Sequence, residues 1–167
     1  DLVYGLPLQT VKSFNETIER AIKLNTDRIV TFSYAHVPSV IPRQKALEDI
    51  GFPTSNEKAK MYEDSYDKLL ESGYVSIGMD HYSKPEDEFS IALKEKKLHR
   101  NFQGYCTRET TGQVYGFGAS AISQLDCAYS QNFKNTMQYI RNIEKNNLSV
   151  FRGYSLSQNE KVIRHVI

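Results

Sequence analysis

The sequence predicts an α/β fold, which we expect to be the later part of an α/β barrel or open sheet running into an α+β extension. Two observations predict it. In residues 1–83, short β-branched or aromatic runs alternate with helical patterns, as they do in βαβ units. From residue 84 onward, short strand-like segments and helices follow one another in no fixed order. The 167 residues suffice for one core, or for one and part of another.

The two ends of the sequence suggest a piece of a longer chain. Asp1 is not preceded by methionine, and residues 2–5 already resemble the end of a strand running into a turn. The last residues keep an apolar pattern with no stop signal after it. We therefore expect both ends to be truncated.

The first predicted unit is strand, helix, strand. Residues 2–4 form a short apolar run, Thr10 is a candidate N-cap, and apolar residues recur at helical spacing over 14–22. A β-branched and aromatic strand follows over 28–34. Because one helix joins the two strands, we expect them to be parallel, with a right-handed crossover.

The next elements are a loop, a helix and a strand. Residues 35–53 contain three prolines and predict a long loop with at most one short turn. The helix after it has the clearest signals, because Thr54 and Glu57 can form a capping box and Gly73 stands where the helix should end. A strand is predicted over 74–78.

The second half is less regular. Residues 79–84 are predicted as a loop, and Pro85 as the first residue of a helix whose acidic residues come first and whose lysines come last. Residues 102–105 and 114–122 are predicted as strand or close-packed backbone. A helix is expected over 133–144, and a short strand over 150–155 precedes a last helical pattern.

Sites in such folds lie at the carboxyl ends of parallel strands. This places Asp1 with residues 4–5, together with 34–36 and 78–81, on one predicted rim. A carboxylate at a strand end can accept hydrogen bonds from ribose hydroxyls. Considered alone, such an aspartate is more often a cap or a solvated residue.

Composition excludes several classes of function. Lysine plus arginine (21) and aspartate plus glutamate (20) nearly cancel and are interspersed, so we expect neither nucleic acid nor an anionic membrane as a partner. No apolar run approaches the ~20 residues of a membrane span. Cys106 and Cys127 lack CxxC spacing, and two thiols cannot hold a four-thiolate cluster, so we expect ordinary thiols in a reducing cytosol.

Several motifs leave alternatives open. The four histidines lack metal-ligand spacing, so no protein-only metal site is expected, although Asp80 could orient His81 toward a ligand. Arg100 is equally consistent with a surface position and with a carboxylate-binding role. Residues 116–123 lack the GxGxxG register, which favours close backbone packing, or backbone pairing with an adenine edge, over a phosphate loop.

Three stretches are more specific. Residues 1–10 (DLVYGLPLQT) are similar to a motif of the coproporphyrinogen oxidase-like radical S-adenosylmethionine proteins. Residues 77–82 (IGMDHY) and 98–105 (LHRNFQGY) resemble the true oxygen-independent coproporphyrinogen III oxidases. With 34–38 and 118–123, the resemblance to that family covers nearly the whole chain. It implies that 1–83 are the C-terminal part of a radical S-adenosylmethionine partial (β/α) barrel, and that 84–167 begin the C-terminal domain.

The resemblance also implies a chemistry. In the family, a [4Fe–4S] cluster held by three cysteines cleaves S-adenosylmethionine, and the resulting radical removes a hydrogen atom from a propionate of coproporphyrinogen III. Loss of carbon dioxide and one electron leaves a vinyl group, twice over, giving protoporphyrinogen IX for haem biosynthesis. The cluster cysteines would lie upstream of Asp1, so this fragment is expected to be inactive alone. The full-length protein is expected to be a cytoplasmic monomer served by an electron-donor protein.

Family roles carry over to a few positions. Asp1 and Ala35 match residues that contact a second S-adenosylmethionine, and Ile122 matches one that packs on the first. His81, Arg100, Gln103 and Tyr105 are substrate-binding candidates because their side chains can bind carboxylates, and the resemblance identifies no catalytic residue in this chain. Cys106 departs from the threonine common in relatives. A non-enzymatic haem chaperone of the same superfamily is the alternative, and the sequence over 79–105 disfavours it.

Overall fold

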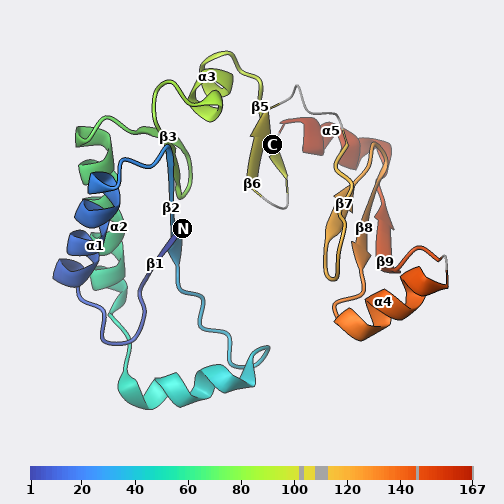
Figure 1. Cartoon of the computed structure of the whole chain (residues 1–167), viewed down its shortest axis with the longest axis horizontal. Helices are drawn as coiled ribbons and strands as arrows, with labels where there is room; N and C mark the ends of the chain where they lie inside the picture. Colours follow the sequence, from blue (N-terminus) through green and yellow to red (C-terminus); the bar gives the residue numbers. More distant parts are fainter. Residues whose placement is uncertain (102–103, 108–112, 146, 167) are drawn as a thin grey trace. The chain divides into compact units, whose positions relative to one another are not determined.

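The computed structural model describes residues 1–101, 104–107, 113–145 and 147–166 (Figure 1). The chain divides into two compact units, residues 1–96 and 97–167. The first unit combines a mixed sheet with helices, and the second is built mainly from antiparallel strands. This agrees with the α/β class and the α+β extension predicted from the sequence.

The sheet of the first unit has four strands. In order across the sheet they are β1 (Leu2–Tyr4), β2 (Arg28–Ser33), β4 (His81–Ser83) and β3 (Val75–Gly78). The parallel pairing of β1 with β2 confirms the predicted βαβ unit. Because β4 is antiparallel to both β2 and β3, β3 runs in the same direction as β1 and β2. The predicted loop over 79–84 is therefore wrong, because its second half forms β4.

Helices α1 (Val11–Lys23) and α2 (Ser55–Glu71) lie together on one face of this sheet (Figure 1). The Thr10 side chain caps α1, and the predicted capping box of α2 is confirmed: the Thr54 amide donates to Glu57 Oε2 at 2.8 Å. Gly73 has a φ of +87°, as expected after the end of a helix. The core between helices and sheet consists of Phe14, Ile18, Ile29, Met61, Leu69, Tyr74 and Tyr82.

The segment between β2 and α2 contains more structure than predicted. A 3₁₀ helix spans Pro42–Ile50, with nine residues rather than one short turn. None of its residues is buried, so it has no apolar face that periodicity could reveal. Pro42 occupies its first position, where a missing backbone N–H costs little.

Helix α3 (Glu88–Lys94) begins later than predicted. Its N-cap is Asp87, whose carboxylate accepts from the Phe89 amide at 2.8 Å. Pro85 lies in the preceding turn, so its predicted place at the first helical position is wrong. The reason is that the side chain of Asp87 can cap an amide, which makes it the stronger start signal.

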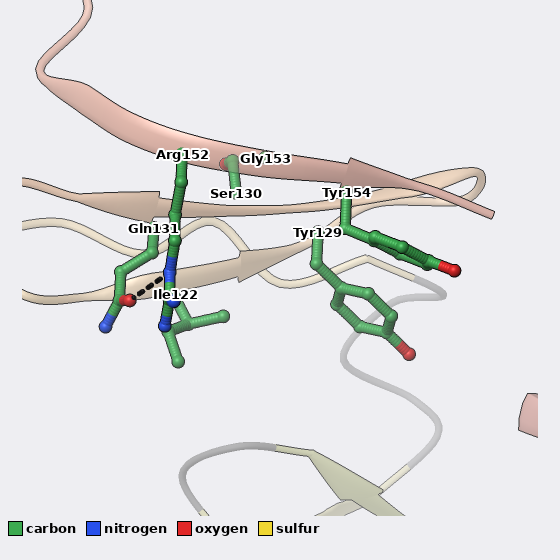
Figure 2. A pocket seen from close by; sticks show the side chains of 7 residues that line it. All are labelled: Ile122, Tyr129, Ser130, Gln131, Arg152, Gly153 and Tyr154. Carbon is green, nitrogen blue, oxygen red and sulfur yellow. Dashed lines mark hydrogen bonds between the residues drawn. The ribbon is translucent and has the colours of Figure 1, made fainter.

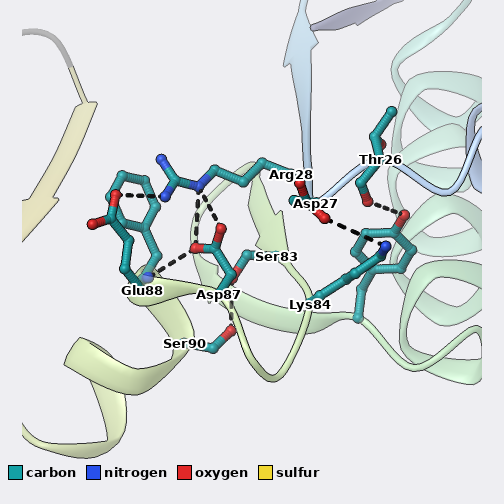
Figure 3. Close-up of polar contacts among 10 residues, drawn as sticks. Thr26, Asp27, Arg28, Ser83, Lys84, Asp87, Glu88 and Ser90 are labelled. Carbon is teal, nitrogen blue, oxygen red and sulfur yellow. Dashed lines mark hydrogen bonds and ion pairs between the residues drawn. The ribbon is translucent and has the colours of Figure 1, made fainter.

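Polar contacts attach α3 to the first unit (Figure 3). Arg28 on β2 donates from Nε to Asp87 at 2.9 Å and from Nη2 to Glu88 at 2.6 Å. The hydroxyls of Ser83 and Ser90 lie 2.6 Å apart in a buried position. These contacts explain why the compact unit extends to Lys96, beyond the domain boundary expected from the family at residue 83.

The second unit has two antiparallel sheets. One pairs β5 (Leu98–Asn101) with β6 (Gly104–Thr107), and the other has β7 (Ile122–Gln124), β8 (Ala128–Asn132) and β9 (Val150–Ser155) in that order. Helices α4 (Thr136–Glu144) and α5 (Gln158–Val166) complete it. The predicted helix, strand and last helix over 133–166 are confirmed. Of the segment 102–105, residues 104–105 are strand and 102–103 lie outside the described residues.

Candidate functional site

The carboxyl ends of β1 and β2 lie level at one edge of the first sheet, because Tyr4 pairs with Ser33. β3 runs in the same direction but ends level with Val30, since Gly78 and Val30 both pair with His81. Segment 34–36 therefore starts from the edge where sheets of this kind bind ligands, as predicted. Segment 78–81 lies beside Val30 and not at that edge.

Asp1 lies at the opposite end of β1. It directly precedes Leu2, so the prediction that it stands at a carboxyl strand end is wrong. The pairing of Leu2 with Thr31 puts Asp1 beside Val30, and Val30 pairs with His81. Asp1 and His81 therefore share one row across the sheet, two strand spacings or roughly 10 Å apart. The register of β4 against β2, in which His81 pairs with Val30, places the two candidates in this row.

The open face of the sheet is the face that α1 and α2 do not cover. Leu2 and Tyr4 pack toward the core, so the alternation of side chains along β1 directs Asp1 and Val3 to the open face. Val3 and Phe32 are 38% and 39% exposed. An apolar surface with a carboxylate and an imidazole in its midst suits an amphipathic small molecule.

His81 is held in a fixed orientation. Its Nδ1 lies 2.8 Å from Asp80 Oδ1, and the Phe32 ring meets it edge-on with ring centroids 6.3 Å apart. The backbone carbonyl of Asp80 accepts from the Thr31 amide at 2.9 Å. Because the carboxylate and the backbone both constrain this turn, the imidazole is preorganised, as the adjacent Asp80 had suggested.

Ala35 follows β2 and is fixed through its backbone. Gln44, in the 3₁₀ helix, donates from Nε2 to the Ala35 carbonyl at 3.0 Å and accepts at Oε1 from the Val37 amide at 2.6 Å. One side chain thus holds both sides of the loop. Sequence reasoning missed Gln44 because no local pattern marks a glutamine that acts on residues seven to nine positions earlier.

His36 contributes to an aromatic cluster beside this loop. The rings of Tyr34 and Phe52 stack with centroids 5.7 Å apart, and His36 lies 4.6 Å from Phe52. Its Nε2 is 3.0 Å from Glu48 of the 3₁₀ helix. These contacts indicate that His36, a predicted rim residue, helps to attach the 3₁₀ helix to the loop.

In the second unit, Ile122 opens β7 against a glycine segment. A Cβ placed on Gly116 would lie 2.8 Å from the backbone C and O of Ile122. Asn132 Nδ2 donates to the carbonyls of Gly116 and Gly118 at 3.1 and 2.9 Å. The predicted close backbone packing is confirmed, and it fixes the position of Ile122.

Arg100 and Tyr105 lie directly opposite each other in the β5–β6 pair. Opposite residues of antiparallel strands project from the same face, so both side chains lie on one side of this pair of strands. His99, next to Arg100, contacts the Gln124 side chain of β7 at 3.3 Å. Gln103, the remaining substrate-binding candidate, lies outside the described residues.

A hollow of about 350 Å³ lies on the β7–β8–β9 sheet (Figure 2). Its lining residues are Ile122, Tyr129, Ser130, Gln131, Arg152, Gly153 and Tyr154. Arg152 Nε donates to Gln131 Oε1 at 3.0 Å. Sequence reasoning assigned no role to Arg152, because its neighbours come from strands that only the fold brings together.

The thiols do not form a cluster site. Cys106 is half-buried on β6, Cys127 is exposed, and they form no disulfide. Within the described ranges, no three histidine, cysteine, aspartate or glutamate side chains are close enough to hold a metal ion. A [4Fe–4S] cluster does not fit the residues of this chain, since it needs three thiolates.

Comparison with known proteins gives strong matches. The oxygen-independent coproporphyrinogen III oxidases of Escherichia coli K12 and Synechocystis are 40% and 41% identical to the chain over 167 residues, covering 100% of the chain and 36% of each relative. The solved structure of coproporphyrinogen III oxidase HemN from Escherichia coli, described as a radical SAM enzyme, matches with a TM-score of 0.90 at 39% identity, over 99% of the chain and 38% of that structure. Along its whole length the chain is similar to the oxygen-independent coproporphyrinogen III oxidases.

The chain thus spans about 36% of the length of the curated coproporphyrinogen III oxidases that it matches. No family model matches it. The similarity to HemN extends through both compact units and supports the α/β fold described above. In the described parts of the chain, no helix is both long and apolar enough to cross a membrane.

Proposed function

We propose that the protein containing this chain converts coproporphyrinogen III to protoporphyrinogen IX without oxygen, as a step of haem biosynthesis. The observation that carries the proposal is the 40% identity along all 167 residues to relatives named as oxygen-independent coproporphyrinogen III oxidases. The match to a radical SAM enzyme supports the same chemistry. Under this proposal, residues 1–83 complete the catalytic barrel and 84–167 begin the C-terminal domain.

In this proposal, the role of the chain is to bind S-adenosylmethionine and the substrate. Asp1 and Ala35 would contact a second S-adenosylmethionine, and Ile122 would pack on the first. In support, Gln44 fixes the backbone at Ala35, and Ile122 borders a hollow large enough for part of a small molecule. S-adenosylmethionine, with a [4Fe–4S] cluster held outside this chain, would supply the radical that oxidises the propionate.

The substrate candidates suit a ligand that carries carboxylates. A guanidinium binds a carboxylate with two parallel hydrogen bonds, and a phenol beside it can donate a third. The register that places Arg100 opposite Tyr105 supports this role for the two side chains. His81, oriented by Asp80, can donate to another carboxylate when it is protonated. We also propose that the full-length protein is a cytoplasmic monomer that receives electrons from a donor protein.

The test is an anaerobic assay of the full-length protein after cluster reconstitution. Coproporphyrinogen III and S-adenosylmethionine are added, and the porphyrins are separated by chromatography after oxidation. We expect protoporphyrin, with two propionates replaced by vinyl groups. Tight haem binding without any vinyl product would overturn the proposal and favour a haem-carrying protein of the same superfamily.

The assigned cofactor contacts can be tested by stoichiometry. In the full-length protein, Asp1→Asn should reduce bound S-adenosylmethionine from two molecules toward one, measured by equilibrium dialysis. Asp67→Asn, at an exposed position on α2, is the matched control and should leave the stoichiometry unchanged. The 167-residue chain alone should bind no iron and cleave no S-adenosylmethionine, and stoichiometric cluster in it would contradict the assignment of the cluster ligands to another segment.

A further inference from the structure

We infer that the hollow on the β7–β8–β9 sheet holds one propionate-bearing pyrrole of the tetrapyrrole, with Arg152 as the carboxylate anchor and Tyr129 and Tyr154 as the walls for the ring. The inference rests on the proposed function and deepens it, because it locates part of the substrate. The hollow is formed entirely within the second unit.

The strand register builds the polar end of the hollow. Gln131 of β8 pairs with Ile122 of β7 on one side and with Arg152 of β9 on the other, so the three side chains form one row across the sheet. Figure 2 shows Arg152 and Gln131 extending side by side toward Ile122. The assigned cofactor contact and the guanidinium therefore project into the same space.

Arg152 is preorganised without being neutralised. Its Nε donates to Gln131 Oε1 at 3.0 Å, while Gln131 Nε2 donates to the Ser120 carbonyl at 3.1 Å. Arg152 forms no ion pair with any described residue, and the hydrogen bond to Gln131 uses only its Nε. Its two terminal nitrogens are therefore suited to a carboxylate, and the order imposed by Gln131 lowers the entropic cost of binding.

The apolar end is formed by two tyrosines in the next row. Tyr129 pairs with Tyr154, and both rings lie to one side of Arg152 (Figure 2). Each has a second contact from α5: the Tyr154 hydroxyl bonds to Glu160, and the Arg164 guanidinium lies 5.7 Å from the Tyr129 ring centroid. Flat aromatic walls next to a cation match a pyrrole ring with an acidic side chain.

The size of the hollow limits what it can bind. About 350 Å³ is near the lower end of small-molecule sites, which span roughly 300–1,000 Å³. It suits one pyrrole with its propionate rather than a whole tetrapyrrole. Because a guanidinium stabilises the carboxylate before reaction, Arg152 suits a propionate that the reaction leaves in place, not one that loses carbon dioxide.

The experiment measures binding and kinetics separately in the full-length protein. Coproporphyrin III is the fluorescent binding probe, and its tetramethyl ester, which lacks carboxylates, is the matched ligand. We expect Arg152→Gln to weaken coproporphyrin III binding about tenfold or more while leaving ester binding unchanged. In the anaerobic assay KM for coproporphyrinogen III should rise by a similar factor and kcat should change less, since the anchor acts before and during the reaction alike.

Two further variants control the result. Arg141→Gln, at an exposed position on α4, should change neither quantity. Arg152→Lys keeps the positive charge but loses the guanidinium that can form two parallel hydrogen bonds, so it should bind coproporphyrin III with intermediate affinity. It replaces Arg152→Gln if that variant does not fold. Unchanged probe affinity and KM in the Arg152 variants, or equal binding of acid and ester by the wild type, would overturn the inference while the proposed function stands. A wild-type protein that makes no vinyl product would overturn both.

Discussion

Gln44 Nε2 donates to the backbone carbonyl of Ala35 at 3.0 Å, which joins the 3₁₀ helix to the loop after β2. The same side chain accepts from the Val37 amide at 2.6 Å. The backbone conformation at Ala35, a proposed cofactor contact, therefore depends on a residue outside the loop. Gln44 acts as a positioning residue, because its contacts are with the protein backbone.

Replacing Gln44 should affect cofactor binding more than folding. Gln44→Leu removes both hydrogen bonds from an exposed loop, so we expect at most about 1 kcal/mol of lost stability. The affinity of the full-length protein for S-adenosylmethionine, measured by calorimetry, should fall several-fold. Gln44→Glu keeps the acceptor for the Val37 amide, so its affinity for S-adenosylmethionine should lie between those of the wild type and Gln44→Leu. Gln138→Leu on α4 is the control, and equal affinities for all variants would contradict the positioning role.

Asp87 combines a helix cap with an ion pair. Asp87→Ala removes the hydrogen bond to the Phe89 amide and the contact with Arg28. We expect the free energy of unfolding in urea to fall by about 1–2 kcal/mol, most of it from the cap, because Arg28 is partly exposed. Asp87→Asn keeps the cap and should recover more than half of the loss. Glu86→Ala, in the exposed turn before the helix, should have little effect, and an equal loss there would argue against the cap.

Gly116 leaves no room for a methyl group. Gly116→Ala places a Cβ 2.8 Å from the Ile122 backbone, so either β7 or the glycine segment must move, at a cost of about 1–3 kcal/mol. We expect a lower melting temperature and faster amide exchange in β7. Phe117→Ala, next in sequence and 89% exposed, should leave both unchanged. A stable Gly116→Ala protein with native exchange in β7 would show that the contact can relax.

Tyr82 makes stability sensitive to alkaline pH. Burial raises the pKa of Tyr82 above its ordinary value of 10.0, so the folded protein keeps this proton where the unfolded chain has begun to lose it. The contribution is therefore fully present below about pH 10 and is lost as the pH rises further. Unfolding in urea between about pH 9 and pH 11 should show a shallower decline in Tyr82→Phe than in the wild type. Tyr115→Phe, at an exposed position, should decline as the wild type does.

Local signals predicted the elements that they control. The Thr54 and Glu57 pair located the start of α2, and the alternation of strand and helix gave the parallel β1–β2 pair. Strand β4 was missed because its three residues are too few to show a pattern. It is a strand because it pairs with β2 on one side and with β3 on the other. Strand β8 was missed because most of its side chains are polar, which suits a strand in a small open sheet but leaves no apolar run to detect.

The sequence suggested candidate site residues, but it did not predict how the fold arranges them. The pairing of Arg100 with Tyr105 was not predicted, because no strand was expected over Leu98–Asn101. The row formed by Asp1 and His81 was not predicted either, because it depends on the stagger of a strand inserted between β2 and β3. Arg152 was overlooked for a similar reason, since its partner Gln131 is twenty-one positions away.

The turn between β3 and β4 positions His81 but is not part of the parallel strands or of the helices that pack on them. Its two residues, Met79 and Asp80, directly precede His81, and Met79 has a φ of +51° and an exposed side chain. A change in the length of this turn would alter the position of the imidazole while the parallel strands and their helices stayed as they are. Changes in this turn, in evolution or in directed selection, can therefore alter ligand preference while the fold stays the same.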